Sequence, residues 1–103
     1  MAGKKVTKAD LIDSIYQKIG VPRKDIRIAV DSFIDEIKDA LIQNQIIELR
    51  GFGTFEIRIR KGRTKARNPR SGELVSVNSH GVAAFRPGKE LKQDVWHITE
   101  KTD

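Results

Sequence analysis

Cysteine is absent from the sequence, which excludes disulfide bonds, thiolate metal sites and cysteine nucleophiles. Long apolar runs are absent too, because none approaches the roughly 18 residues that a membrane-spanning helix needs. Residues 1–5 lack the apolar stretch of a secretory signal peptide. We therefore expect a soluble, cytoplasmic protein with no role at a membrane.

Residues suited to catalysis are equally scarce. The only histidines are His80, at an expected bend, and His97, near the C-terminus, and neither has a nucleophile and an orienting acid nearby in the sequence. The sequence Gly88-Lys89-Glu90 lacks the other residues of a phosphate-binding loop. We therefore expect no enzyme activity, no metal, no cofactor and no small-molecule substrate.

Apolar residues make up 38% of the 103-residue chain, a low share for a chain that must fold alone. This length suits one domain with a small core. The composition is therefore compatible with the association of two chains.

Helical signals fill the N-terminal part of the chain. Thr7 followed by Asp10 resembles a capping box, and Gly20 is a typical helix stop, so the pattern predicts a helix over Lys8–Ile19. A second apolar stripe with helical spacing extends from Ile26 to Leu41 and predicts a helix that begins near Pro22 and ends near Asn44. The short link between the two predicts a helical hairpin.

Strand signals follow. Residues 46–49 are strand formers, and residues 54–60 alternate apolar and polar side chains, which is typical of an antiparallel sheet with one solvated face. The intervening Gly51-Phe52-Gly53 predicts a tight turn in which the glycines supply positive φ angles. A last strand is expected over Glu73–Arg86, with a bulge or bend at His80-Gly81.

A short helix over Lys89–Trp96 closes the predicted order α-α-β-β-β-α. Trp96 either caps the sheet or lies across a dimer interface, and the sequence does not choose between these. The expected fold is α+β, with a helical base, a three-stranded antiparallel sheet and a protruding β-ribbon arm. The expected division of this single domain is a base over about 7–44, a sheet and arm over about 45–86, a helix over about 88–96, and flexible ends at 1–6 and 97–103.

Positive charge is concentrated in one stretch. Residues 58–70 hold seven Lys or Arg and no acid, whereas the other 90 residues carry 13 basic and 14 acidic side chains. Such a stretch is typical of polyanion binding, because each cation placed beside a phosphate can release a condensed counterion. The alternative is a solvated basic loop. The flanking strand-like segments favour a basic two-stranded ribbon, which can enter a groove of duplex DNA.

Pro69 lies near the end of this stretch. Asn68-Pro69 is a common turn dipeptide, so one interpretation is that the proline only shapes the turn. Proline is also a rigid apolar wedge without an N–H group, which suits it to insertion between base pairs.

Several separated motifs, in order, resemble the bacterial HU and integration host factor family of histone-like proteins. The resemblance extends from Thr7 to about Trp96. Its motifs are Gly51-Phe52-Gly53-Thr54-Phe55, Arg67-Asn68-Pro69, Gly72-Glu73 and Phe85-Arg86-Pro87-Gly88-Lys89-Glu90-Leu91.

The resemblance implies an intertwined dimer, either a homodimer or a pair with a related chain, whose two arms reach around double-stranded DNA in its minor groove. It implies that Pro69 intercalates and that Lys8 and Lys89 bind phosphate near helix N-termini. The DNA-binding residues that we expect are Lys8, Arg50, Arg58, Arg60, Lys61, Arg63, Lys65, Arg67, Asn68, Pro69, Arg70, Arg86 and Lys89.

The sequence departs from the family pattern in the arm. The segment from Glu56 to Pro69 is one residue longer than expected, Ala66 replaces a usual glycine, and Ser71 replaces a usual threonine. Residues 48–53 resemble the integration host factor branch more than HU. Arg50 is therefore a candidate DNA contact, with a solvated charge on the sheet as the alternative.

The function that we predict is non-catalytic: the protein bends and condenses DNA in the bacterial nucleoid. Any preference for a sequence is expected to come from how easily it kinks. Site-specific bending, in the manner of integration host factor, is an alternative. Binding of structured RNA, binding of an acidic partner or anionic membrane through the arm, and a nuclease are further, weaker alternatives.

Overall fold

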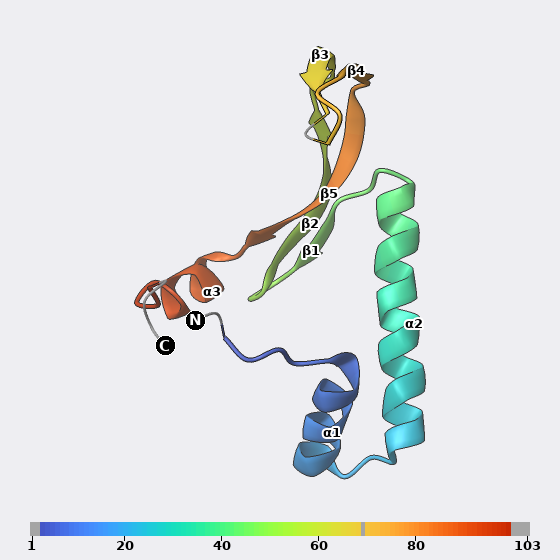
Figure 1. Cartoon of the computed structure of the whole chain (residues 1–103). Coiled ribbons are helices and arrows are strands. Elements are labelled where there is room, and N and C mark those ends of the chain that lie inside the picture. The colour runs from blue at the N-terminus through green and yellow to red at the C-terminus, as the bar shows by residue number, and fades with distance from the viewer. Residues whose placement is uncertain (1–2, 69, 100–103) are drawn as a thin grey trace.

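The computed structural model describes residues 3–68 and 70–99, and for the strand residues 63–67 and 74–77 it describes only the backbone. Pro69 and the terminal residues 1–2 and 100–103 lie outside the described residues. Figure 1 shows a pair of helices, a sheet that extends into a long two-stranded arm, and a short helix near the C-terminus. The elements are α1 (Lys8–Ile19), α2 (Arg23–Ile42), β1 (Ile47–Leu49), β2 (Gly53–Arg60), β3 (Arg63–Arg67), β4 (Leu74–Val77), β5 (His80–Pro87) and α3 (Lys89–Asp94).

The first helix has the predicted boundaries. The backbone N–H of Asp10 donates to Oγ1 of Thr7 over 3.3 Å, and the N–H of Thr7 donates to Oδ2 of Asp10 over 3.0 Å. Gly20 ends the helix at φ 70°, in the left-handed region that glycine tolerates best. The local chemistry of the sequence is therefore sufficient to define α1.

The second helix packs beside the first (Figure 1). Arg23, its first residue, joins the two helices, because its Nε lies 2.6 Å from Oδ1 of Asp13 and its guanidinium lies 3.9 Å from the centre of the Tyr16 ring. The helix ends at Ile42, two residues before the predicted end. Asn44 adopts φ 58°, so it takes the left-handed conformation that its sequence position predicts, one residue beyond the C-cap.

A three-stranded antiparallel sheet has the order β1-β2-β5. The turn between β1 and β2 contains Gly51 at φ 83°, and the N–H of Phe52 donates to the carbonyl of Leu49 over 2.9 Å. Gly53 has a different reason to be glycine. A Cβ atom there would lie 2.5 Å from Cε1 of Phe85 and 2.6 Å from the carbonyl oxygen of Arg86. Of the two glycines, only Gly51 therefore adopts the predicted positive φ.

The last predicted strand is divided in two, and its predicted bulge or bend at His80-Gly81 is wrong in position. Both residues belong to a regular ladder, with His80 opposite Arg60 and Gly81 opposite Ile59. The interruption comes earlier, at residues 78–79, where the N–H of Gly62 donates to Oγ of Ser79 over 3.0 Å. Beyond it β3 and β4 form a separate two-stranded sheet, which is the outer part of the arm.

The arm also contains a register shift. Arg63 pairs with Val77 and Ala66 pairs with Val75, so three steps along β3 match two steps along β4. One residue of β3 is therefore extra, as in a β-bulge. The bulge lies in the segment that, from the resemblance, is expected to be one residue longer than the family pattern.

The short C-terminal helix ends at Asp94, not at Trp96 as predicted, because residues 95–97 form a turn. It is joined to the sheet by the N–H of Gly88, which donates to the carbonyl of Phe52 over 2.8 Å. No helix within the described part of the chain is long and apolar enough to cross a membrane.

The single chain is extended and has little core of its own. Its radius of gyration is 18.8 Å, whereas a compact domain of about 100 residues has about 13 Å. Of the described apolar side chains, only Ile12 and Ile26 are buried. Phe33 on α2 is 53% exposed, and Ile42 is 82% exposed. The predicted α+β architecture is therefore confirmed, but one chain alone leaves most of its apolar residues uncovered.

Candidate nucleic-acid interface

The cationic residues follow the length of the β2–β5 ribbon. Arg58 and Arg60 lie towards the end of β2 that continues into the arm, and Lys61 follows directly. All three are exposed. At the opposite end of the ribbon, Arg50 precedes β2 and Lys89 follows β5. The ribbon therefore carries positive charge from the turn of the β1–β2 hairpin to the arm.

Hydrogen bonds join the described residues on both sides of position 69 at the tip of the arm. The N–H of Asn68 donates to the carbonyl of Glu73 and the N–H of Gly72 donates to the carbonyl of Asn68, both over 2.7 Å. The side-chain Oδ1 of Asn68 accepts the N–H of Arg70 over 2.9 Å, as in an Asx turn. Asn68 thus has a structural role in the turn, beside the groove contact that the resemblance implies.

Pro69, the expected intercalating residue, lies outside the described residues. The side chains of three further expected contacts lie outside them as well, namely Arg63, Lys65 and Arg67. The backbone places these three on β3, beyond the interruption at residues 61–62.

Two of the expected contacts on the β2–β5 ribbon share one carboxylate. Nε of Arg58 donates to Oε2 of Glu56 over 3.1 Å, and Nη2 of Arg86 lies 3.6 Å from Oε1 of the same side chain. The Glu56 side chain is 18% exposed, whereas those of Arg58 and Arg86 are 48% and 60% exposed. Glu56 therefore orients two arginines whose guanidinium groups stay accessible to an anion.

This role of Glu56 is not among the functions predicted for the residues of the ribbon. The alternation of apolar and polar residues in β2 indicates that Glu56 and Arg58 share a face, so an ion pair between these two residues could be expected from the sequence. Arg86 joins them only through the pairing of β2 with β5, in which Thr54 lies opposite Arg86 and Glu56 lies opposite Ala84.

Lys8 also has a carboxylate partner. Its Nζ lies 2.6 Å from Oδ1 of Asp31 on α2, so it is placed on the helical base and not on the ribbon. The nearby N-terminus of α1 is already capped by the protein itself. The pKa of Asp10 is lowered because its carboxylate accepts the backbone N–H of Thr7 and, to a lesser extent, interacts with the Thr7 side chain. A phosphate at this helix end would have to share the site with that carboxylate.

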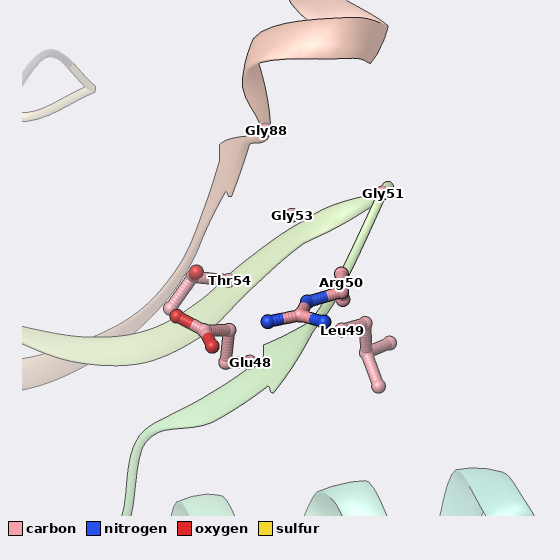
Figure 2. Close-up of a pocket in the computed structure, with 7 residues that line it drawn as sticks. All are labelled: Glu48, Leu49, Arg50, Gly51, Gly53, Thr54 and Gly88. Atoms are coloured by element: carbon pink, nitrogen blue, oxygen red, sulfur yellow. The ribbon is translucent and has the colours of Figure 1, made fainter.

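Arg50 lies in a surface pocket of about 270 Å³ at the turn of the β1–β2 hairpin. Figure 2 shows its guanidinium extending over the hairpin towards the side chains of Glu48 and Thr54, which face each other in the register of the two strands. Gly88 lines the same pocket, so the chain reaches Lys89 directly beside it. The structure thus brings Arg50 and Lys89 to one end of the sheet.

Over the described residues, no three Asp, Glu or His side chains cluster in a way that could hold a metal ion. What the arrangement offers is a set of exposed guanidinium and ammonium groups along a twisted antiparallel ribbon, which is suited to contacts with phosphate oxygens.

Comparison with known proteins decides the family. The family model described as "Bacterial DNA-binding protein" matches residues 6–95. The chain belongs to this family. It is similar to the alpha subunit of integration host factor from Hahella chejuensis, with 40% identity over 90 residues that make up 87% of this chain and 89% of the relative. It is also 43% identical to the DNA-binding protein HU of Thermus thermophilus over 96 residues, 92% of this chain and 98% of that protein.

Solved structures of the family share the fold. An HU–DNA cocrystal structure from Anabaena matches with a TM-score of 0.82 and 30% identity, covering 90% of this chain and all of that one. The HU structure from Thermotoga maritima matches with a TM-score of 0.63 and 28% identity, covering 87% of this chain and 98% of that one. The family that the sequence motifs indicated is therefore confirmed.

Proposed function

We propose that this chain is an architectural DNA-binding protein that bends double-stranded DNA with two basic arms and performs no catalysis. The observation that carries the proposal is the basic β-ribbon, in a chain of the bacterial DNA-binding family. The ribbon lifts exposed cations away from the body on paired strands, and such a ribbon fits a groove of a duplex. The bacterial chromosome, and thus a cytoplasmic nucleoid, is the proposed place of action.

The working unit is a dimer of this chain or of this chain with a close relative. The open apolar faces support this step. Phe52, Phe55 and Phe85 form a cluster with ring centres 4.9–6.4 Å apart, yet Phe52 is still 47% exposed and Phe85 39% exposed. A second chain laid over these rings and over α2 would supply the core that one chain lacks.

Each protomer of that dimer contributes one arm. We propose that the arms follow the minor groove, that the cations hold the sugar–phosphate walls, and that Pro69 inserts between base pairs as a wedge. The resemblance to the family supports the wedge. The Asx turn from Asn68 to Arg70 supports it too, because it holds the two residues that flank Pro69 in one conformation.

DNA drawn down along the flanks would then meet the second set of cations. Arg50 and Lys89 lie together at the far end of the ribbon, and Lys8 lies on the base. A bent duplex touches more of this surface than a straight one, and these added contacts offset the cost of deforming the DNA.

A second candidate is site-specific bending. The pocket around Arg50 favours it, because a guanidinium oriented beside Glu48 and Thr54 is better placed for one groove geometry than a freely moving charge. Relatives named as integration host factor and as HU match at similar identity, so the comparisons do not favour either kind of binding.

Energy transfer between dyes at the two ends of a duplex tests the proposal. A duplex of about 35 base pairs is longer than the roughly 20–30 base pairs of a typical bent site, so bending brings its ends together. The protein is titrated against a random sequence, one containing an A-tract, and a nicked one. We expect higher transfer on all three, and highest affinity for the nicked duplex. High transfer on one sequence only would favour site-specific bending, and binding without any rise in transfer would contradict the proposal.

RNA provides the specificity control. An RNA duplex of the same sequence resists kinking and presents a wide, shallow minor groove. It should therefore compete poorly for the protein, and equal competition would favour a structured-RNA-binding module instead.

A further inference from the structure

The short helix α3 and the turn after it carry a feature that duplex bending does not explain. Trp96, the one tryptophan of the sequence, is 77% exposed. It lines a surface cavity of about 520 Å³ together with Lys89, Lys92 and Gln93. This volume lies within the range of about 300–1,000 Å³ that is usual for small-molecule and cofactor sites.

Charges of opposite sign are separated on this element. Three of the four residues that line the cavity, Lys89, Lys92 and Gln93, lie on one face of α3, and Trp96 lies in the turn that follows the helix. The two acids of the helix, Glu90 and Asp94, are four residues apart on another face and do not line the cavity. The indole of Trp96 is therefore accompanied by two ammonium groups and an amide without a neighbouring carboxylate in the cavity.

These groups match the parts of a nucleotide. A flat indole stacks on the face of any base, two ammonium groups attract the adjoining phosphates, and a side-chain amide both donates to and accepts from a base edge. In a duplex, however, the base faces are covered by their neighbours in the stack. An exposed indole can therefore reach a base face without the cost of unstacking only where the base is unpaired.

We propose that the Lys89–Lys92–Gln93–Trp96 surface binds single-stranded DNA, with one unpaired base stacked on Trp96. The proposal rests on the proposed function for its choice of nucleic acid, and it adds a second form of DNA as partner. The surface lies beyond the end of β5 that is opposite to the arm, so the two sites occupy different ends of the sheet (Figure 1). Only Lys89 belongs to both the flank of the duplex site and this surface.

The single tryptophan makes its own fluorescence the first test. A thymidine oligonucleotide of about 15 residues covers the usual length of a single-strand site and is titrated against the full-length protein. We expect saturable quenching, because a stacked base quenches indole emission, and no comparable quenching by inorganic polyphosphate. Equal quenching by both polyanions, or none by the oligonucleotide, would overturn the proposal.

The free protein must show an accessible indole. Efficient acrylamide quenching and a red-shifted emission maximum are the expected result. Emission typical of a buried indole that resists acrylamide would mean that a second chain covers Trp96, and this outcome would also overturn the proposal.

Variants then measure the stacking through the anisotropy of a dye-labelled oligonucleotide. Trp96→Leu should weaken single-strand binding roughly tenfold, and Trp96→Phe should weaken it less, because a phenyl ring still stacks. Lys92→Gln should reduce the salt dependence of the same binding. Ile98→Ala is the matched control, because Ile98 is also an exposed apolar residue (58%) but does not line the cavity. If the two Trp96 variants and Lys92→Gln bind the oligonucleotide as tightly as the control Ile98→Ala, this surface has no role in binding.

End-to-end energy transfer on the duplex separates this proposal from the proposed function. Trp96→Leu should bend the duplex as the unaltered protein does. The double variant Arg60→Gln with Lys61→Gln should lose duplex affinity while its Trp96 emission is still quenched by the oligonucleotide. If neither the unaltered protein nor Trp96→Leu bends the duplex, but the oligonucleotide still quenches Trp96 in the unaltered protein, the bending proposal fails and the single-strand site stands. If both proteins bend the duplex, but the oligonucleotide does not quench Trp96 in the unaltered protein, only the single-strand site is rejected.

Discussion

Glu56 on β2 and Arg86 on β5 approach each other across the ribbon, with Oε1 of the acid 3.6 Å from Nη2 of the arginine. The same carboxylate accepts a hydrogen bond from Arg58. An acid thus lies between two cations that we propose to contact DNA. A phosphate must compete with Glu56 for both guanidinium groups, so Glu56 opposes DNA binding although it orients the arginines.

Replacing this acid tests the relationship. Glu56→Gln retains the shape of the side chain and removes the charge that repels phosphate. Exposed ion pairs contribute only about 0.2–1 kcal/mol, so we expect duplex binding to tighten about two- to fivefold for each arm. Asp35→Asn on the polar side of α2 is the control, because it makes the same change in net charge far from the ribbon. Weaker binding by Glu56→Gln would show that orientation of the arginines matters more than repulsion.

Local chemistry made much of the fold predictable. Thr7, Asp10 and Gly20 define α1 through contacts with their own neighbours in the chain, and Asn44 takes the left-handed conformation that a residue of its type tolerates. Such features depend on a few adjacent residues, so the sequence suffices for them.

Features that depend on strand pairing were not predictable in the same way. Gly81 was expected to interrupt a strand, yet it pairs with Ile59, and a Cβ atom there would lie 3.0 Å from Cγ2 of Ile57. Glycine at this position therefore allows the Ile57 side chain to approach the backbone closely, and the strand is not interrupted there. The link of Arg86 to Glu56 and the bulge in β3 likewise follow from register, which no single segment encodes. For the site, the family motifs located the cations, but they did not reveal which of them already have a carboxylate partner.

Salt dependence should report the arm cations. If affinity comes from counterion release, the logarithm of the binding constant falls linearly with the logarithm of salt concentration, with a slope of about 0.9 for each phosphate neutralised. Arg60→Gln should therefore lower the slope by about one for each protomer. Lys38→Gln on α2 is the control and should leave the slope unchanged. A flat salt dependence of the unaltered protein would contradict the electrostatic account of its affinity.

Pro69→Ala should reduce bending far more than stability. The turn around this position is closed by Oδ1 of Asn68 and the N–H of Arg70, neither of which belongs to the proline. We expect the melting temperature to change little, with a loss of at most about 0.5 kcal/mol of unfolding free energy. End-to-end energy transfer in the DNA complex should fall clearly. Unchanged transfer would rule out the wedge and leave Pro69 as a turn residue.

The cap of α1 should make stability depend on pH in the acid range. The pKa of Asp10 is lower in the folded chain than its ordinary value of 3.8, so the ionised carboxylate stabilises the fold. That contribution is complete above the ordinary pKa and is lost as the pH falls through the lower, folded-state pKa. Asp10→Asn should therefore reduce the melting temperature at neutral pH, and the difference from the unaltered protein should vanish in strong acid. A pH-independent difference for Asp10→Asn would contradict the capping role.

Substitution of Phe33, an exposed residue of α2, tests the proposed dimer. On a monomer surface, a substitution of this 53% exposed residue would change stability little. In an interface, Phe33→Asp would bury an unpaired carboxylate at a cost of several kcal/mol, so the dimer Kd should rise more than about a hundredfold. Because one chain has so little core, loss of the dimer should appear as unfolding, with a melting temperature that depends on protein concentration. Analytical ultracentrifugation and thermal scans measure both effects. Ser32→Asp, which adds the same charge at the adjacent exposed position, should remain dimeric, and a stable, folded monomer of Phe33→Asp would contradict the proposal that dimerisation completes the fold.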